Sequence, residues 1–277
     1  MILLATFVAP PIAYNLLMEH ISSRHNPHFK QARKLAESVR ERKKSNLLLL
    51  DGTRLIGSYA AQFGMGETTL LLSGQGADHP GVQSLVQSAP LQRVYVLTDE
   101  LFAEISNVES PEGIVCIAGL PRVQTRPTDD FRILLDGVQD PGNLGGILRT
   151  AAAAGATSAH LSKGCADAWS PRSLRGGMGA QFVLPFRERV DLGTALVGFR
   201  GLIIATSPRA ESTIYEIDLT GPVAFIFGSE GQGLRSEILE AANQLVHIPM
   251  HDGVESLNVA AAAAICCFEK RRQTLRI

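Results

Sequence analysis

The chain has 277 residues, of which 45% are hydrophobic and 19% charged, and its formal net charge is −1. This composition excludes a disordered chain, and the length allows two ordinary domains. No segment approaches the ~20 consecutive apolar residues of a membrane-spanning helix, so we expect no membrane association. The four cysteines show neither metal-binding spacing nor a disulfide framework, which favours a cytoplasmic protein without metal.

The first half of the chain predicts a small α/β domain over residues 15–117. Residues 1–14 are apolar but contain two prolines and no leading basic residue, so we interpret them as an N-terminal extension and not a signal peptide. The pattern that follows predicts helices over 27–39, 52–63, 80–88 and 98–107, and strands over 46–50, 68–72, 93–97 and 114–117.

Positive charge is concentrated near the start of this domain. Nine Lys or Arg residues lie between Arg24 and Arg54, against three acidic residues. A solvated helix face is the simpler interpretation. We favour an RNA-facing surface because the excess is of one sign.

A proline-containing linker over residues 118–130 precedes the second domain, residues 131–277. Its pattern predicts strands over 131–138, 158–161, 181–184, 202–205, 223–227 and 245–248, and helices over 144–154, 170–178, 191–199, 235–242 and 257–272. Apolar strands alternating with helices indicate a parallel sheet with helices on both faces.

Three polar loops in this domain each follow an apolar strand: Asp140–Arg149, Phe227–Gly233 and Ile248–Asn258. Strands of a parallel sheet end at one edge, where ligands bind, so we expect the loops to form one site. The sequence contains no P-loop, no G-x-G-x-x-G fingerprint and no G-x-S-x-G elbow. These absences disfavour an NTPase, a dinucleotide enzyme and a serine hydrolase.

Several side chains in the loops have both a structural and a functional interpretation. Asn143 is expected to cap the helix that follows it, and Ser256 to cap helix 257–272. Asn258 would then fall in the first helical turn, where capping does not explain it. Glu230 stands between glycines, which suits either a ligand contact or a flexible turn.

Arg149 lies in an Ala-rich helix, three residues after Gly146. The missing side chain at Gly146 opens a groove beside the guanidinium on the same helical stripe. We therefore interpret Arg149 as functional.

Together the loops carry Asn143-x-Gly145-x-x-x-Arg149-Thr-Ala, Gly228-x-Glu230-Gly-x-Gly233-Leu and Ile248-Pro-Met-x(5)-Ser256-Leu-Asn258-Val-Ala. This set resembles the three motifs of the SpoU/TrmH family of RNA ribose 2′-O-methyltransferases, over residues 131–272. Residues 15–117 resemble the L30e-like substrate domain that often precedes the catalytic one, through Ser22-Ser-Arg-His-Asn26 and Leu49-Leu-Asp-Gly-Thr-Arg-Leu55. One departure is Gly176-Gly177, where the family more often has alanine and serine.

The resemblance implies a SPOUT fold with a C-terminal trefoil knot, S-adenosylmethionine as methyl donor, and a homodimer formed through the knotted domain. Its catalytic set would be Asn143, Arg149, Glu230, Ser256 and Asn258. Its donor-binding residues would be Gly228, Ile248, Leu257, Thr206 and Ser207. RNA would contact the basic residues Arg24, Lys30, Arg33, Lys34 and Arg40.

The implied reaction transfers a methyl group to a ribose 2′-hydroxyl, with ribosomal RNA of the 23S type as the expected substrate. Transfer RNA is the alternative, and a non-catalytic RNA-binding protein on the same fold is an alternative of another class. Family proposals often make the motif-one arginine the general base. We favour electrostatic stabilisation by Arg149, because a guanidinium stays protonated at neutral pH.

Overall fold

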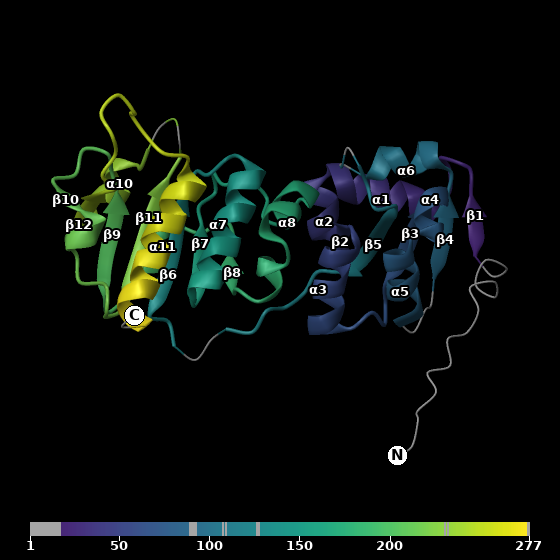
Figure 1. The fold of residues 1–277 in the computed structure, drawn as a ribbon, viewed down its shortest axis with the longest axis horizontal. Helices are drawn as coiled ribbons and strands as arrows, with labels where there is room; N and C mark the ends of the chain where they lie inside the picture. Colours follow the sequence, from purple (N-terminus) through teal and green to yellow (C-terminus); the bar gives the residue numbers. More distant parts are fainter. Residues whose placement is uncertain are drawn as a thin grey trace, which may run out of the picture.

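The computed structural model describes residues 18–88, 93–106, 108, 110–125, 128–229, 231 and 233–275. The predicted N-terminal extension and Glu230 lie outside these residues. Two α/β domains lie side by side along the long axis of the molecule, with helix α8 between them (Figure 1). The domain bounds at residues 15–117 and 131–277 stay a prediction.

The N-terminal domain is built on a five-stranded mixed sheet in the order β1-β4-β3-β5-β2. Its strands are β1 (Glu19–Ile21), β2 (Leu47–Asp51), β3 (Thr69–Ser73), β4 (Val94–Leu97) and β5 (Ile114–Gly119). Its helices are α1 (Pro27–Glu37), α2 (Val39–Ser45), α3 (Thr53–Phe63), α4 (Gly74–Asp78), α5 (Pro80–Ser88) and α6 (Asp99–Ile105). Apolar side chains that alternate along β2, β3 and β5 supply a separate core on each face of the sheet.

The helix predicted over residues 27–39 is α1, which ends at Glu37, and a separate helix, α2, begins at Val39. Ser38 has an extended backbone, and its side chain accepts the N–H of Glu41 at 3.2 Å. Ser38 therefore ends α1 and caps α2, which turns the basic segment and gives α2 its own direction.

The C-terminal domain is a seven-stranded sheet in the order β10-β12-β9-β11-β6-β7-β8, and all its neighbouring strands are parallel. Its strands are β6 (Phe131–Asp136), β7 (Ser158–Leu161), β8 (Phe186–Arg187), β9 (Leu202–Thr206), β10 (Ser212–Thr213), β11 (Val223–Gly228) and β12 (Gln244–His247). Its helices are α7 (Pro141–Ala154), α8 (Pro171–Gly177), α9 (Leu192–Leu196), α10 (Ser236–Glu240) and α11 (Val259–Leu275), with short 3₁₀ turns η2 (Ala180–Phe182) and η3 (Ile214–Glu216).

Helices cover both faces of this sheet, as predicted. Side chains of α7 and α11 belong to the core on one face, and those of α9 and α10 to the core on the other. The predicted strand over residues 181–184 is wrong, because η2 occupies that segment and the edge strand is β8. Gln181 and Phe182 are fully or almost fully buried, and Phe182 packs in the core of the N-terminal domain. A buried apolar segment of this length resembles an interior strand in sequence.

Helices α7 and α8 pack with their backbones in contact. A methyl group at Gly145 would lie 2.2 Å from the carbonyl oxygen of Ser173, and one at Gly176 would lie 2.8 Å from that of Gly142. Gly176, which departs from the family pattern, therefore packs beneath the helix that carries Asn143. Such contact requires glycine on both helices.

This contact yields a stability prediction with an internal control. Gly145→Ala should lower the free energy of unfolding by about 1–3 kcal/mol or more, because the backbone of α8 cannot accommodate the added carbon. The neighbouring Gly146→Ala should instead stabilise by about 0.5–1 kcal/mol, since its nearest atom, the Ala260 Cβ, would lie at 3.6 Å. Thermal unfolding of both variants checks the prediction. Equal melting temperatures would contradict the described packing.

Among the described residues, no helix is long and apolar enough to cross a membrane. The trefoil knot stays a prediction.

Candidate active site

The carboxyl ends of β9, β11 and β12 meet at one edge of the parallel sheet and enclose a cavity of about 400 Å³. The five predicted donor-binding residues line it together with Ser256: Thr206, Ser207, Gly228, Ile248 and Leu257. They come from three chain segments separated by helices and strands. Two of the three predicted loops, 227–233 and 248–258, contribute to this cavity, whereas the first loop, 140–149, does not line it.

Gly228 lies where the chain folds back on itself after β11. A Cβ there would lie 2.5 Å from the carbonyl carbon of Gly233 and 2.8 Å from the backbone nitrogen of Leu234. Ser229 and Gly233 form an antiparallel bridge, with the Gly233 N–H donating to the Ser229 carbonyl at 2.9 Å. Only glycine at 228 allows this tight turn, which forms one wall of the cavity.

The cavity offers both apolar surface and backbone polar groups. Ile248, Leu257 and Val259 contribute apolar side chains, while the adjoining strand ends bring peptide groups to the wall. This mixture and size are typical of a site for a drug-sized or cofactor-sized molecule. The residues present fit S-adenosylmethionine, which has an aromatic base, an aliphatic chain and several hydrogen-bonding groups.

Two asparagines join the first and third loops beside this cavity. The Nδ2 of Asn258 donates to the Oδ1 of Asn143 at 3.1 Å. The Oδ1 of Asn258 accepts the N–H groups of Ala260 and Ala261 at 2.9 and 3.3 Å, which fixes the orientation of its amide. Asn258 is thus the donor of the bond that links the two loops, and Asn143 the acceptor.

Both capping predictions for these loops are wrong. Asp140, and not Asn143, caps α7, because its carboxylate accepts the Asn143 N–H at 2.8 Å. Helix α11 begins at Val259, so its cap is Asn258 instead of Ser256. Because neither residue caps a helix, the Asn143 side chain contacts Asn258, and Ser256 lies on the cavity wall.

Arg149 is exposed on α7, one turn beyond Gly145 and Gly146 on the same side of the helix. Gly146 faces Ala260 in the first turn of α11. The guanidinium has no hydrogen-bond or ion-pair partner within the described part of the chain. Arg149 thus presents a cation on the surface of α7, the helix that also carries Asn143. Glu230 lies outside the described residues.

Sequence reasoning missed other residues of the cavity wall, including Arg209 and Met250. Met250 directly follows Ile248-Pro249 in the third loop, and Arg209 is separated from the predicted Ser207 by Pro208, in a Ser-Pro-Arg turn after β9. Met250 already lies within the third motif but was given no role, and Arg209 could have been found by extending the Thr206–Ser207 segment past the strand end. Arg209 places a positive charge at the rim.

A larger cavity of about 750 Å³ lies elsewhere, between the interdomain linker, the edge of the sheet and α9. Arg132, His160 and Trp169 line it, and none of the predicted site residues does. Burial, together with the charge of Arg132, lowers the pKa of His160. This cavity lacks the convergence of strand ends that marks the smaller one.

The predicted RNA-contacting residues lie on or near α1 and α2. Arg24 and Arg33 pair with Glu104, at 2.5 and 3.8 Å, whereas Lys30, Lys34 and Arg40 are exposed and form no ion pair with any described residue. In the described ranges no group of three or more His, Cys, Asp or Glu residues could hold a metal ion.

The comparison with known proteins decides the family. Residues 130–268 match the SpoU rRNA Methylase family, and residues 26–116 match the MRM3-like substrate binding domain. The chain belongs to the SpoU rRNA methylase family.

Two curated relatives extend this match over nearly the whole chain. An uncharacterized tRNA/rRNA methyltransferase of Synechocystis is 38% identical, covering 91% of this chain and 93% of its own. The 23S rRNA (guanosine(2553)-2′-O)-methyltransferase RlmP of Bacillus subtilis is 30% identical, covering 92% and 100%.

Solved structures of methyltransferases match this chain over both domains. A crystal structure of an RNA 2′-O ribose methyltransferase superposes with a TM-score of 0.81 at 31% identity, covering 92% of this chain and 99% of its own. The SpoU methyltransferase AviRb from Streptomyces viridochromogenes, crystallised with AdoMet, has a TM-score of 0.79 at 26% identity, covering 90% and 98%. The SpoU fold is thus shown for the full two-domain arrangement.

Proposed function

We propose that this SpoU methylase transfers a methyl group from S-adenosylmethionine to a ribose 2′-hydroxyl of ribosomal RNA of the 23S type. The observation that carries the proposal is the cavity in which Thr206, Gly228, Ile248 and Leu257 converge beside the Asn143–Asn258 pair. The names of the relatives, one a 23S rRNA 2′-O-methyltransferase, support the substrate class.

S-adenosylmethionine, when bound, supplies an electrophilic methyl group on a sulfonium. The chain's own residues have to orient the 2′-hydroxyl and stabilise the negative charge that develops on its oxygen. Arg149 is an exposed cation on α7, the helix that also carries Asn143, and we assign it this stabilising role. Asn143 and Asn258 hold the first and third loops in register, and Ser256 and Glu230 complete the proposed catalytic set.

Arg209 has the charge required to pair with a carboxylate at the rim of the cavity. The donor's methionine part carries such a carboxylate. The backbone turn at Gly228 and the apolar side chains of Ile248 and Leu257 suit the rest of the donor.

The exposed cations of α1 and α2 are proposed to bind the RNA backbone. Lys34→Glu combined with Arg40→Glu should weaken RNA binding at least tenfold at low salt. The slope of log affinity against log salt should also fall by about 0.7–0.9 for each lost phosphate contact. Arg24→Glu should weaken binding less, because Glu104 already neutralises Arg24. Filter binding across a salt series measures both, and an unchanged slope in the double variant would remove α1 and α2 from the RNA surface.

We also propose that the protein is a homodimer through its knotted catalytic domain and works in the cytoplasm. Helix α11 supports the dimer, because Phe268 and Leu275 are 49% and 45% exposed on it. All four cysteines are free thiols, which suits a reducing compartment. Phe268→Asp should convert a dimer to monomer in light scattering, and a wild-type monomer would contradict this assembly.

A methylation assay tests the proposed function. Purified protein and S-adenosylmethionine are incubated with unmodified 23S rRNA or with unmodified tRNA, and 2′-O-methyl positions are then mapped in each. We expect modification at a defined rRNA nucleotide. Modification of tRNA alone would favour the alternative substrate. The absence of transfer to either RNA, with RNA binding intact, would favour the non-catalytic RNA-binding protein.

A further inference from the structure

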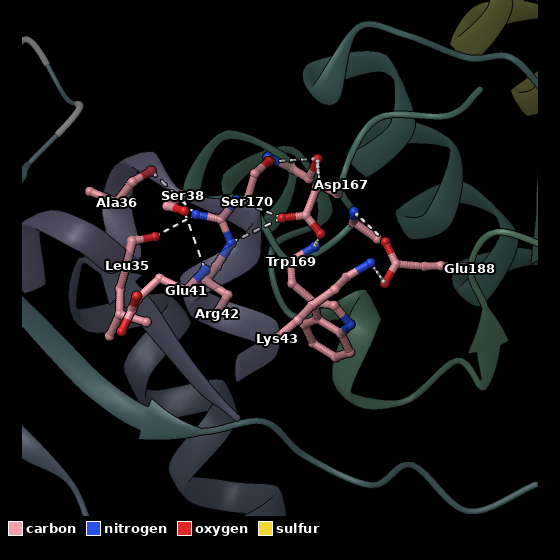
Figure 2. Close-up of polar contacts among 12 residues, drawn as sticks. Leu35, Ala36, Ser38, Glu41, Arg42, Lys43, Asp167, Trp169, Ser170 and Glu188 are labelled. Atoms are coloured by element: carbon pink, nitrogen blue, oxygen red, sulfur yellow. Dashed lines mark hydrogen bonds and ion pairs between the residues drawn. The ribbon is translucent and has the colours of Figure 1, made fainter. Parts of the chain in front are cut away.

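Helix α2 carries an arginine that does not face solvent. Its neighbours Arg40, Lys43 and Lys44 are exposed, whereas Arg42 is only 4% exposed and reaches into the catalytic domain. Figure 2 shows the Arg42 side chain pointing from α2 to Asp167, which precedes α8. The basic segment thus has two faces with different roles.

The Arg42 guanidinium is bound on both sides. Its Nε and Nη2 donate to the Oδ2 of Asp167 at 2.9 and 2.6 Å, and its Nη1 donates to the carbonyl groups of Leu35 and Ala36 (Figure 2). A planar fork with this many fixed partners permits one relative position of the domains. Apolar contact alone is not directional and would tolerate small shifts.

Asp167 is itself held rigidly in the catalytic domain. Its backbone carbonyl accepts the Ser173 hydroxyl at 2.8 Å, and its Oδ1 accepts the Trp169 N–H at 3.4 Å. Next to it, Glu188 accepts the Ala168 N–H at 3.1 Å and lies 3.9 Å from the Lys43 Nζ. The contact therefore joins α2 directly to the start of α8.

Helix α8 continues this connection to the active site. Leu174 of α8 and Phe182 of η2 pack in the core of the N-terminal domain. There the rings of Phe182 and Tyr59 meet edge-on, with their centroids 5.5 Å apart. On its other side α8 lies in backbone contact with α7, at Gly142 and Gly145. These glycines flank Asn143, so the position of α2 is transmitted to the asparagine pair through two rigid contacts.

We propose that Arg42 and Asp167 are positioning residues that fix the distance between the RNA-binding surface of α1 and α2 and the site of methyl transfer. The pair thereby determines which nucleotide reaches Arg149. This inference rests on the proposed function, and it assigns the pair no contact with RNA or donor. Buried ion pairs often add little net stability over apolar replacements, which makes a role in geometry testable separately from folding.

The test uses the full-length protein with both charges removed, Arg42→Met together with Asp167→Asn. Each single change would leave a buried charge without its counter-ion and endanger folding, whereas the double variant avoids this. Arg40→Met serves as the comparison, because it removes a positive charge from the same helix on its exposed face.

We expect the double variant to bind S-adenosylhomocysteine and RNA within threefold of wild type, while its kcat on saturating RNA falls at least tenfold. Its 2′-O-methyl groups should spread to neighbouring nucleotides. Arg40→Met should instead raise KM for RNA and leave the modified position unchanged. Electron–electron distances between spin labels at Gln62→Cys and Arg200→Cys should be narrowly distributed in wild type and broad in the double variant.

A double variant with wild-type kcat, one modified position and a narrow distance distribution would overturn the inference. A broad distribution with normal kcat and position would also overturn it, since loosened domains would then leave catalysis unaffected. A wild-type protein that methylates no RNA would instead defeat the proposed function, and the two failures are therefore distinguishable.

Discussion

Replacing Arg149 by alanine should reduce kcat by about 10²–10³, the range found when one donor that stabilises a developing negative charge is removed. Binding of S-adenosylmethionine and RNA should remain within a few-fold of wild type. Arg149 is exposed on α7, one turn beyond Gly145 and Gly146, and does not line the donor cavity. Its loss therefore removes charge from the reaction without opening the cavity.

Arg149→Lys distinguishes the two roles left open for this residue. A lysine retains the positive charge but loses the planar fork, so electrostatic stabilisation predicts an intermediate kcat. Single-turnover rates under saturating RNA measure this step separately from product release. A lysine variant as inactive as the alanine variant, with RNA binding intact, would contradict the electrostatic role.

Replacing Gly228 by alanine should weaken binding of S-adenosylmethionine at least tenfold, or about 1.4 kcal/mol. The added carbon would lie 2.6 Å from the carbonyl oxygen of Gly233, a backbone atom that can only move with its loop. That loop supplies Ser229, Gly231 and Gly233 to the cavity wall. Isothermal titration with S-adenosylmethionine gives the dissociation constant directly.

Gly221→Ala is the matched control for this prediction. Gly221 precedes the other end of β11, and a Cβ there would meet no atom within 4 Å. The control should bind the donor as wild type does. Equal, unweakened affinities in both variants would mean that the turn at Gly228 does not hold the donor.

The sequence predicted the parallel sheet and its covering helices because apolar strands and amphipathic helices have distinct periodicities. It also predicted that the loops carrying Gly228 and Ile248 share one site, since parallel strands end at one edge, whereas Thr206 came only from the family resemblance. Local sequence rules predicted the wrong N-cap residues for α7 and α11. Both Asp140 and Asn143 are good capping residues, and only the geometry of the turn shows that Asp140 accepts the hydrogen bond.

The contacts between domains lay beyond sequence reasoning for a different reason. Arg42 and Asp167 are 125 residues apart, and nothing in the local pattern separates Arg42 from the exposed cations around it. The segment at Phe182 has a strand-like pattern because apolar side chains that face another domain resemble those that face a sheet. Pairings across domains depend on tertiary structure, which periodicity does not encode.

A crystal structure of the protein grown with S-adenosylhomocysteine tests the central claim most directly. The account predicts ligand density in the cavity bounded by Thr206, Gly228, Ile248 and Leu257, next to the asparagine pair. Density only in the larger cavity beside Arg132 and Trp169, or an empty structure at saturating ligand, would contradict it.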